Sequence, residues 1–153
     1  MAITKLISNP CNSENSLRNL CNYIVNPEKV GNSGRYVFGR GIRSDTAYED
    51  ITEMQELFGK TSGRRAYHLM VSLPDTIGLG NEDMLETSRK ISDLFYPRYQ
   101  LLCGVHVCQG HLHAHFAVNP VPMEAGNNRK LEINYSFMTE LSQEIEKIID
   151  DYT

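Results

Sequence analysis

The chain has 153 residues, of which 41% are hydrophobic and 22% charged, with 11 glycines and 6 prolines. This length suits one globular domain with its own core, and the composition excludes collagen-like, coiled-coil and low-complexity proteins. The formal net charge of −4 argues against a passive nucleic-acid coat, because binding to phosphates depends on lysine and arginine.

Neither a membrane span nor a secretion signal is expected. The chain contains no run of about eighteen apolar residues. Its start, MAITKLIS, lacks a long apolar region and a small-residue cleavage site. The four cysteines show no CxxC spacing, which predicts reduced thiols in a cytoplasmic protein.

Hydrophobic periodicity predicts a mixture of helices and strands. A helix is expected from Asn12 to Val25, capped by Ser13, with Tyr23 at the edge of its apolar stripe. The other expected elements are strands at 2–8 and 35–40, helices at 47–58, 82–96 and 135–152, and alternating strands at 67–73, 101–108 and 111–119.

The three alternating strands carry apolar residues in one phase and polar residues in the other, as in strands with one buried face. Only Gln109 and Gly110 separate the last two strands, which predicts a hairpin. The pattern predicts one α+β domain over residues 1–153, an antiparallel sheet with helices packed on one face. The acidic helix at 135–152 is expected to point away from any nucleic acid.

All five histidines occur in the alternating strands, in the phase opposite to the apolar one. A single histidine on such a strand usually has a structural role and binds no metal. Three on one strand, with His106 on a neighbouring strand about 4.8 Å away, predict a metal site, because neutral imidazole is a common ligand. Three histidines with an open coordination position are typical of catalytic sites. We expect His106, His111, His113 and His115 to be exposed together on the open face of the sheet.

The segment from His106 to Asn119 resembles the third motif of conjugative relaxases of the HUH endonuclease superfamily, a histidine-rich strand that ends in Asn and binds a divalent metal. The segment from Leu20 to Lys29, LCNYIVNPEK, is similar to the first motif, which contains the nucleophilic tyrosine. The segment 67–72 resembles the one that precedes the third motif. The resemblance spans roughly residues 1–125 in the family's order and implies the HUH relaxase fold with a ferredoxin-like core.

The resemblance implies site- and strand-specific nicking of DNA, as in plasmid or conjugative mobilization. Tyr23 is the implied nucleophile, forming a 5′-phosphotyrosyl intermediate and a free 3′-hydroxyl. The implied metal ligands are His106, His113 and His115. The residues expected to support the site are His68, Ser72, His111 and Asn119. Mg²⁺ or Mn²⁺ is expected in the reaction, whereas Zn²⁺ or Ni²⁺ binds imidazoles more tightly and is expected in the purified protein.

The sequence departs from the family pattern at two places. Cys108 stands where the family usually has an aspartate, and a thiol is a poor substitute for a carboxylate that orients an imidazole. The chain also ends soon after the metal motif, whereas relaxases commonly continue, which suggests a truncated or minimal domain.

The expected partners are single-stranded DNA at an origin of transfer and accessory mobilization proteins, in the bacterial cytoplasm. Lys29, Arg35, Arg40 and Arg43 form a basic cluster. Tyr36 and Phe38 alternate with these residues, as in a groove that binds single strands by stacking. The alternative interpretation of this segment is a solvated loop and edge strand.

Three alternatives belong to other classes. The segment 111–117 also fits the histidine-triad nucleotide hydrolases, but these place a glutamine four residues before the first histidine, and Gln109 is two before. That function would leave His106 and Tyr23 without roles. Rolling-circle initiators place their tyrosine after the metal strand. A catalytically inactive module for single-stranded DNA or metal would bind DNA without a covalent adduct.

Overall fold

The computed structural model describes residues 2–7, 11–60, 62–73, 78–107, 112–124 and 129–151. Every predicted helix and strand is present, and the short helices α2 and η1 are additions. The elements are, in order, β1 (Ile3–Leu6), α1 (Glu14–Ile24), α2 (Pro27–Val30), β2 (Val37–Arg40), η1 (Ser44–Thr46), α3 (Ala47–Phe58), β3 (Tyr67–Ser72), α4 (Asn81–Ser92), β4 (Tyr99–His106), β5 (His113–Pro122) and α5 (Tyr135–Asp150).

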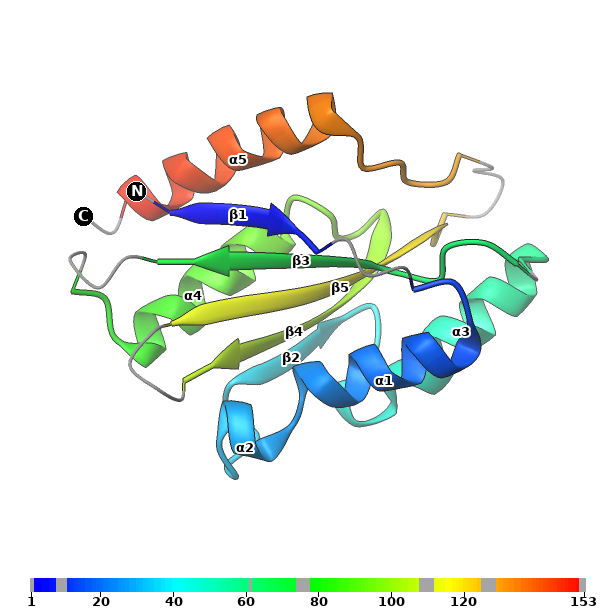
Figure 1. Cartoon of the computed structure of the whole chain (residues 1–153), viewed down its shortest axis with the longest axis horizontal. Coiled ribbons are helices and arrows are strands. Elements are labelled where there is room, and N and C mark those ends of the chain that lie inside the picture. Colours follow the sequence, from blue (N-terminus) through cyan, green and yellow to red (C-terminus); the bar gives the residue numbers. More distant parts are fainter. Residues whose placement is uncertain are drawn as a thin grey trace.

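The strands form one sheet in the order β1-β3-β5-β4-β2, and every neighbouring pair is antiparallel (Figure 1). The predicted α+β class with an antiparallel sheet is therefore confirmed. Strand β5 lies in the centre, between β3 and β4, so the three histidine-bearing strands are neighbours. The predicted turn at Gln109 and Gly110 lies outside the described residues.

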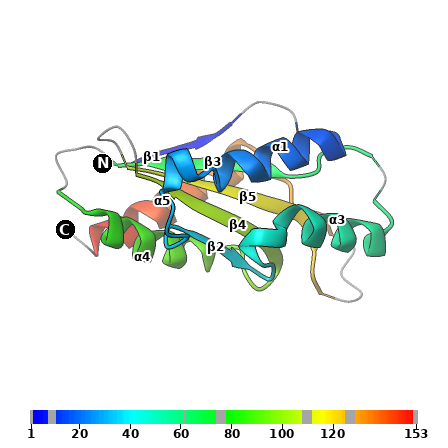
Figure 2. The same ribbon diagram turned by 90° about the horizontal axis from the view of Figure 1, so that it is seen from below.

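The apolar phase of the central strands forms the main core. Leu69, Cys103 and Phe116 are buried there together with side chains from α4 and α5. The apolar faces of these two helices contribute Met84, Leu85, Ile91, Leu141, Ile145 and Ile149. Helix α5 thus packs on the side of the sheet opposite to α1, as Figure 2 shows.

The prediction that helices pack on one face only is wrong, because α1 and α3 cover part of the second face (Figure 2). Leu102 and Ala117 interrupt the polar phase and pack against the buried stripe of α1 and against Ile51 of α3. The amphipathic helix α1 needs an apolar surface to bury this stripe. The second face is therefore divided between a small core and a patch of histidines.

Helix α1 begins and ends where the sequence pattern predicts. The Ser13 side chain accepts a hydrogen bond from the Ser16 amide at 3.0 Å and caps the first turn. Cys21 and Ile24 are buried, whereas Tyr23, on the edge of the stripe, is 40% exposed. The cap and the stripe together bring Tyr23 to the edge of the contact between α1 and the sheet.

Gly104 of β4 allows the end of α1 to approach the sheet closely. A Cβ atom at this position would overlap the Ile24 carbonyl oxygen, a backbone atom that cannot move aside as a flexible side chain can. We expect Gly104→Ala to lower the free energy of unfolding by about 1–3 kcal/mol, the usual cost of overpacking. Chemical denaturation measures this loss. Gly59→Ala cannot serve as a control, because Gly59 has a positive φ of 84°, at which an alanine side chain strains the backbone by itself. Unchanged stability in Gly104→Ala would contradict the close approach of α1.

Candidate active site

Tyr23 lies over a cluster of imidazole rings. Its ring centroid is 5.2 Å from that of His106, 5.3 Å from that of His115 and 6.0 Å from that of His68, with edge-on geometry in each case. The tyrosine comes from the last turn of α1, and the histidines come from β4, β5 and β3. Residues from four elements thus meet at one place, although 83 positions of sequence (106 − 23) separate Tyr23 from His106.

The register of the central strands brings the histidines together. His106 of β4 lies directly opposite His113 of β5, and His115 lies opposite Gly104. The ring centroids of His106 and His115 are 4.1 Å apart, and those of His113 and His115 are 6.2 Å apart. The three predicted metal ligands therefore lie side by side on one face of the sheet.

Two hydrogen bonds fix the rings at the centre of the cluster. Nε2 of His68 and Nδ1 of His115 are 2.8 Å apart. Nε2 of His106 lies 3.2 Å from the carbonyl oxygen of Ile24, to which it donates. One of these bonds joins two strands, and the other joins β4 to the end of α1.

The prediction that the histidines are exposed together on an open face is wrong for the two at the centre. His106 is 6% exposed and His115 is 4% exposed, because Tyr23 and the end of α1 cover them. His68 and His113 are half-buried. The cluster is therefore a covered site with an accessible tyrosine at its edge.

Burial keeps these imidazoles neutral. It lowers the pKa of His115 from 6.5 to about 2, with smaller effects of the charges of other histidines and Lys29. Burial also lowers the pKa of His68 to about 4, and His106 contributes to this shift. The pKa of His106 is lowered by burial, against the opposing effect of its bond to the Ile24 carbonyl. Neutral imidazole is the form that binds metal ions.

The lowered pKa values predict a pH-dependent stability of the metal-free protein. Between about pH 6.5 and pH 4, unfolded histidines bind protons that the folded protein excludes at His68 and His115. Stability must therefore fall as the pH falls through this window. Chemical denaturation of the wild type and of His115→Gln at several pH values measures the effect. The variant should lose less stability on acidification, and parallel curves for the two proteins would contradict the prediction.

The donor set suits a divalent metal in its chemistry. Three neutral imidazoles form a borderline-soft set, favourable to Mn²⁺, Ni²⁺ and Zn²⁺. Within the described ranges, however, no three His, Cys, Asp or Glu side chains have donor atoms placed to hold an ion. Nε2 of His106 donates to the Ile24 carbonyl, so metal binding through this atom would require that bond to break. His106, His113 and His115 therefore suit a divalent metal by their chemistry and by their position side by side on the sheet.

The other residues expected to support the site lie in different places. Ser72 of β3 is directly opposite His113 and lies beside the cluster. Asn119 is fully buried toward the other end of β5, where its side chain bonds to those of Gln55 and Gln100 at 3.1 and 2.9 Å. Asn119 thus connects α3 to the sheet. His111 and Cys108 lie outside the described residues.

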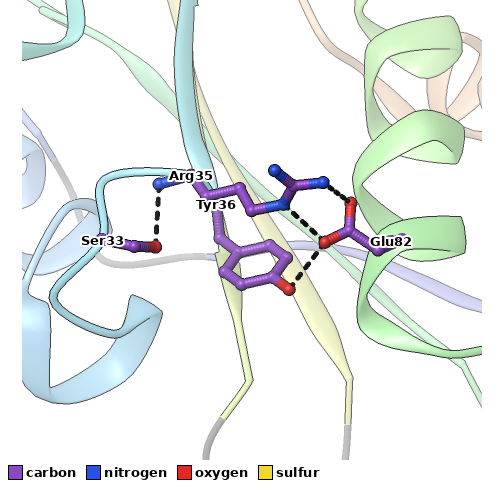
Figure 3. Close-up of polar contacts among 4 residues, drawn as sticks. All are labelled: Ser33, Arg35, Tyr36 and Glu82. Atoms are coloured by element: carbon purple, nitrogen blue, oxygen red, sulfur yellow. Dashed lines mark hydrogen bonds and ion pairs between the residues drawn. The ribbon is translucent and has the colours of Figure 1, made fainter.

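Arg35 and Arg40 do not gather around Tyr23. The Arg35 guanidinium forms a two-pronged ion pair with Glu82 of α4, with Nη2 2.8 Å from Oε2, and the Tyr36 hydroxyl donates to the same carboxylate at 3.0 Å (Figure 3). Nη1 of Arg40 contacts Asp93 at 2.7 Å, just after α4. These two arginines are therefore held on the side of the sheet that α4 covers.

Arg43 and Lys29, the other two cations of the predicted groove, are not held at α4 as Arg35 and Arg40 are. Arg43 forms an exposed ion pair with Asp45 at 3.3 Å, beside α3. Lys29 of α2 is adjacent to the histidines, because its carbonyl oxygen accepts a hydrogen bond from Val107 at 2.9 Å. Burial is the main cause of the lowered pKa values of His106 and His115, and the charge of Lys29 lowers them further. Of the four predicted cations, Lys29 is the one beside the cluster.

A cavity of about 580 Å³ opens beside Tyr23. One wall is the exposed side of α1, where Ser16, Asn19 and Leu20 precede Tyr23 at helical spacing, and the other wall includes His68 and Met70 of β3. Asn19, Leu20 and Met70 are not among the site residues predicted from the sequence. Their spacing was the available signal, because positions three and four residues before Tyr23 share its helix face, and Met70 shares the strand face of His68.

The antiparallel sheet carries a histidine cluster beneath the helix-borne Tyr23, and the family model that matches the chain makes this the fold of a nuclease domain. Residues 23–149 match the family described as relaxase, MobA/VirD2-like, nuclease domain, and the chain belongs to this family. The predicted resemblance to relaxases is thereby confirmed. No curated protein sequence matches the chain.

Two solved structures share the fold. One, from work on the molecular basis of vancomycin resistance transfer in Staphylococcus aureus, has a TM-score of 0.63 at 10% identity, covering 99% of this chain and 91% of that one. The other is the conjugative relaxase TrwC in complex with oriT DNA, in a metal-bound structure. It has a TM-score of 0.56 at 10% identity, covering 99% of this chain and 68% of the chain in that structure.

Among the helices of the described ranges, none combines the length and the apolar character needed to cross a membrane.

Proposed function

We propose that the chain nicks one strand of DNA by transesterification at Tyr23. The Tyr23 hydroxyl gives up its proton as Oη forms a bond to the phosphorus of a phosphodiester. The bond from phosphorus to the 3′-oxygen breaks, and the 3′-oxygen takes up a proton, so that no proton is gained or lost overall. The products are a 5′-phosphotyrosyl DNA and a free 3′-hydroxyl. The observation that carries this proposal is the position of Tyr23, partly exposed and within 5.3 Å of the rings of His106 and His115. The energy retained in the ester permits religation.

A divalent metal completes the proposed site, held by His106, His113 and His115. When bound there, a metal offsets the negative charge that develops on the phosphate in the transition state. The metal-bound state of TrwC, which shares the fold, supports this assignment. The protein's own part is to keep the imidazoles neutral by burial and to hold Tyr23 against them.

The proposed substrate is single-stranded DNA at an origin of transfer, by analogy with the oriT complex of TrwC. The cavity beside Tyr23 is lined by apolar side chains such as Leu20 and Met70 and by the amide of Asn19, a combination that suits a nucleobase. We propose that it holds the nucleotide next to the cleaved phosphate. Accessory mobilization proteins and a bacterial cytoplasmic setting complete the proposal, and the free thiols of Cys11, Cys21 and Cys103 fit a reducing compartment.

The test is a covalent-adduct assay. Single-stranded oligonucleotides tiled across the DNA that flanks the gene are incubated with the protein and Mn²⁺ and then resolved under denaturing conditions. We expect one oligonucleotide, from one strand, to form a denaturation-resistant adduct that EDTA abolishes. Binding without an adduct would favour the inactive DNA-binding module. Hydrolysis of a nucleoside phosphoramidate without metal would favour the histidine-triad function.

The position of Lys29 predicts unequal roles for the cations. We expect Lys29→Gln to weaken binding of single-stranded DNA and to reduce the slope of log affinity against log salt by about 0.7, the effect of one lost phosphate contact. Arg35→Gln is the matched control, because Arg35 is held at α4, away from Tyr23, and should contribute less. Fluorescence anisotropy over a salt series measures both slopes. Equal losses would show that Arg35 leaves Glu82 to bind DNA.

A further inference from the structure

His68 makes a direct bond to one of the proposed metal ligands. Its Nε2 lies 2.8 Å from Nδ1 of His115, within hydrogen-bonding distance. The two residues come from β3 and β5, which pair with Met70 opposite His115 and His68 opposite Ala117. The contact therefore rests on the sheet register, which keeps His68 and His115 diagonal neighbours on one face.

This bond has two proton arrangements, with opposite consequences for the site. A neutral imidazole carries one N–H and one nitrogen with a free lone pair. If His68 donates, Nε2 of His115 carries the remaining proton and cannot bind a metal. If His115 donates from Nδ1, its Nε2 has a free lone pair. Only the second arrangement makes His115 a ligand through Nε2.

We propose that His68 is a positioning residue that accepts the Nδ1 proton of His115 and thereby presents Nε2 of His115 to the metal. This inference rests on the proposed function, because it assigns His68 a role toward that metal. An outer partner of this kind fixes both the tautomer and the orientation of a ligating imidazole. Carboxylates and backbone carbonyls usually supply this bond, and here an imidazole nitrogen does.

The geometry favours a hydrogen bond over joint coordination by the two histidines. Two nitrogens that bind one tetrahedral Zn²⁺ at 2.0–2.1 Å lie about 3.3 Å apart. The observed separation of Nε2 and Nδ1 is 2.8 Å. His68 is also on the far side of His115 from β4, which contributes His106, since β5 lies between β3 and β4.

The first test reads the tautomer directly in the metal-free wild type. Nitrogen-15 NMR of the imidazole side chains distinguishes a protonated Nδ1 from a protonated Nε2. We expect His115 to be protonated at Nδ1 and His68 to carry its proton on its own Nδ1. A proton on Nε2 of His115 would overturn the proposal. This measurement needs neither metal nor DNA, so it remains decisive if the wild type binds no Mn²⁺ and the proposed metal site fails.

The second test compares two substitutions of His68 by calorimetric titration with Mn²⁺. Leucine removes the acceptor, and we expect His68→Leu to weaken Mn²⁺ binding by about 10–100-fold. Glutamine keeps an acceptor oxygen at the end of a side chain of similar reach, and we expect His68→Gln to retain most of the affinity. Equal losses in both variants would assign His68 as a ligand and overturn the proposal, as would unchanged binding in His68→Leu. Amide NMR spectra verify that both variants are folded.

Discussion

Substitution of Tyr23 by phenylalanine is expected to abolish covalent attachment to DNA. The phenyl ring can keep its edge-on contacts with His106 and His115, but it lacks the oxygen that attacks phosphorus. Because Tyr23 is 40% exposed, loss of its hydroxyl should change the free energy of unfolding by no more than about 0.5 kcal/mol. Adduct formation on the cleaved oligonucleotide, measured beside thermal unfolding, checks both parts of the prediction.

Tyr36→Phe is the matched control for this experiment. The Tyr36 hydroxyl donates to Glu82 of α4 (Figure 3). Tyr36 is therefore held toward α4 and away from the histidine cluster. Its loss should leave adduct formation near the wild-type level. An unchanged adduct yield in Tyr23→Phe would move the nucleophile to another tyrosine.

Removal of one proposed ligand should have the second-largest effect. Loss of a residue that only hydrogen-bonds to a metal ligand weakens metal binding by about 10–100-fold. We expect His113→Ala to weaken Mn²⁺ binding by more than this, because a direct metal bond is lost. Calorimetric titration of the metal-stripped protein measures the change. His111→Ala is measured beside it, because His111 is expected to support the site but is not a predicted ligand. Unchanged Mn²⁺ binding in His113→Ala would refute the site.

The same titrations should rank the metals. Three imidazoles should bind Mg²⁺ most weakly, then Mn²⁺, with Ni²⁺ and Zn²⁺ tighter. Cleavage should nevertheless depend on Mn²⁺ or Mg²⁺, because the hard phosphate oxygen must exchange at the open coordination position. EDTA should therefore abolish nicking, and Mn²⁺ or Mg²⁺ should restore it. Restoration by Zn²⁺ alone would contradict this order of activity.

Local patterns were sufficient to predict the helices and the strands, and they identified Tyr23 and the histidines that meet in the cluster. The spacing of Leu17, Cys21 and Ile24 placed Tyr23 at the edge of a helix, and the period-two alternation placed all histidines in one phase. These inferences hold because side-chain direction repeats every 3.6 residues in a helix and every two in a strand. The family resemblance then connected Tyr23 with His106, His113 and His115.

The burial of the histidines and the separation of the cations could not be read from such patterns. Both depend on which face of the sheet each helix covers, and Gly104, Leu102 and Ala117 are what bring α1 and α3 onto the histidine face. That covering lowers the pKa of His115 and sets Tyr23 beside it. The bond of Arg35 to Glu82 likewise joins a loop to a helix 47 residues away. Alternation along a strand records which residues share a face, whereas contacts between distant segments depend on how the elements pack together.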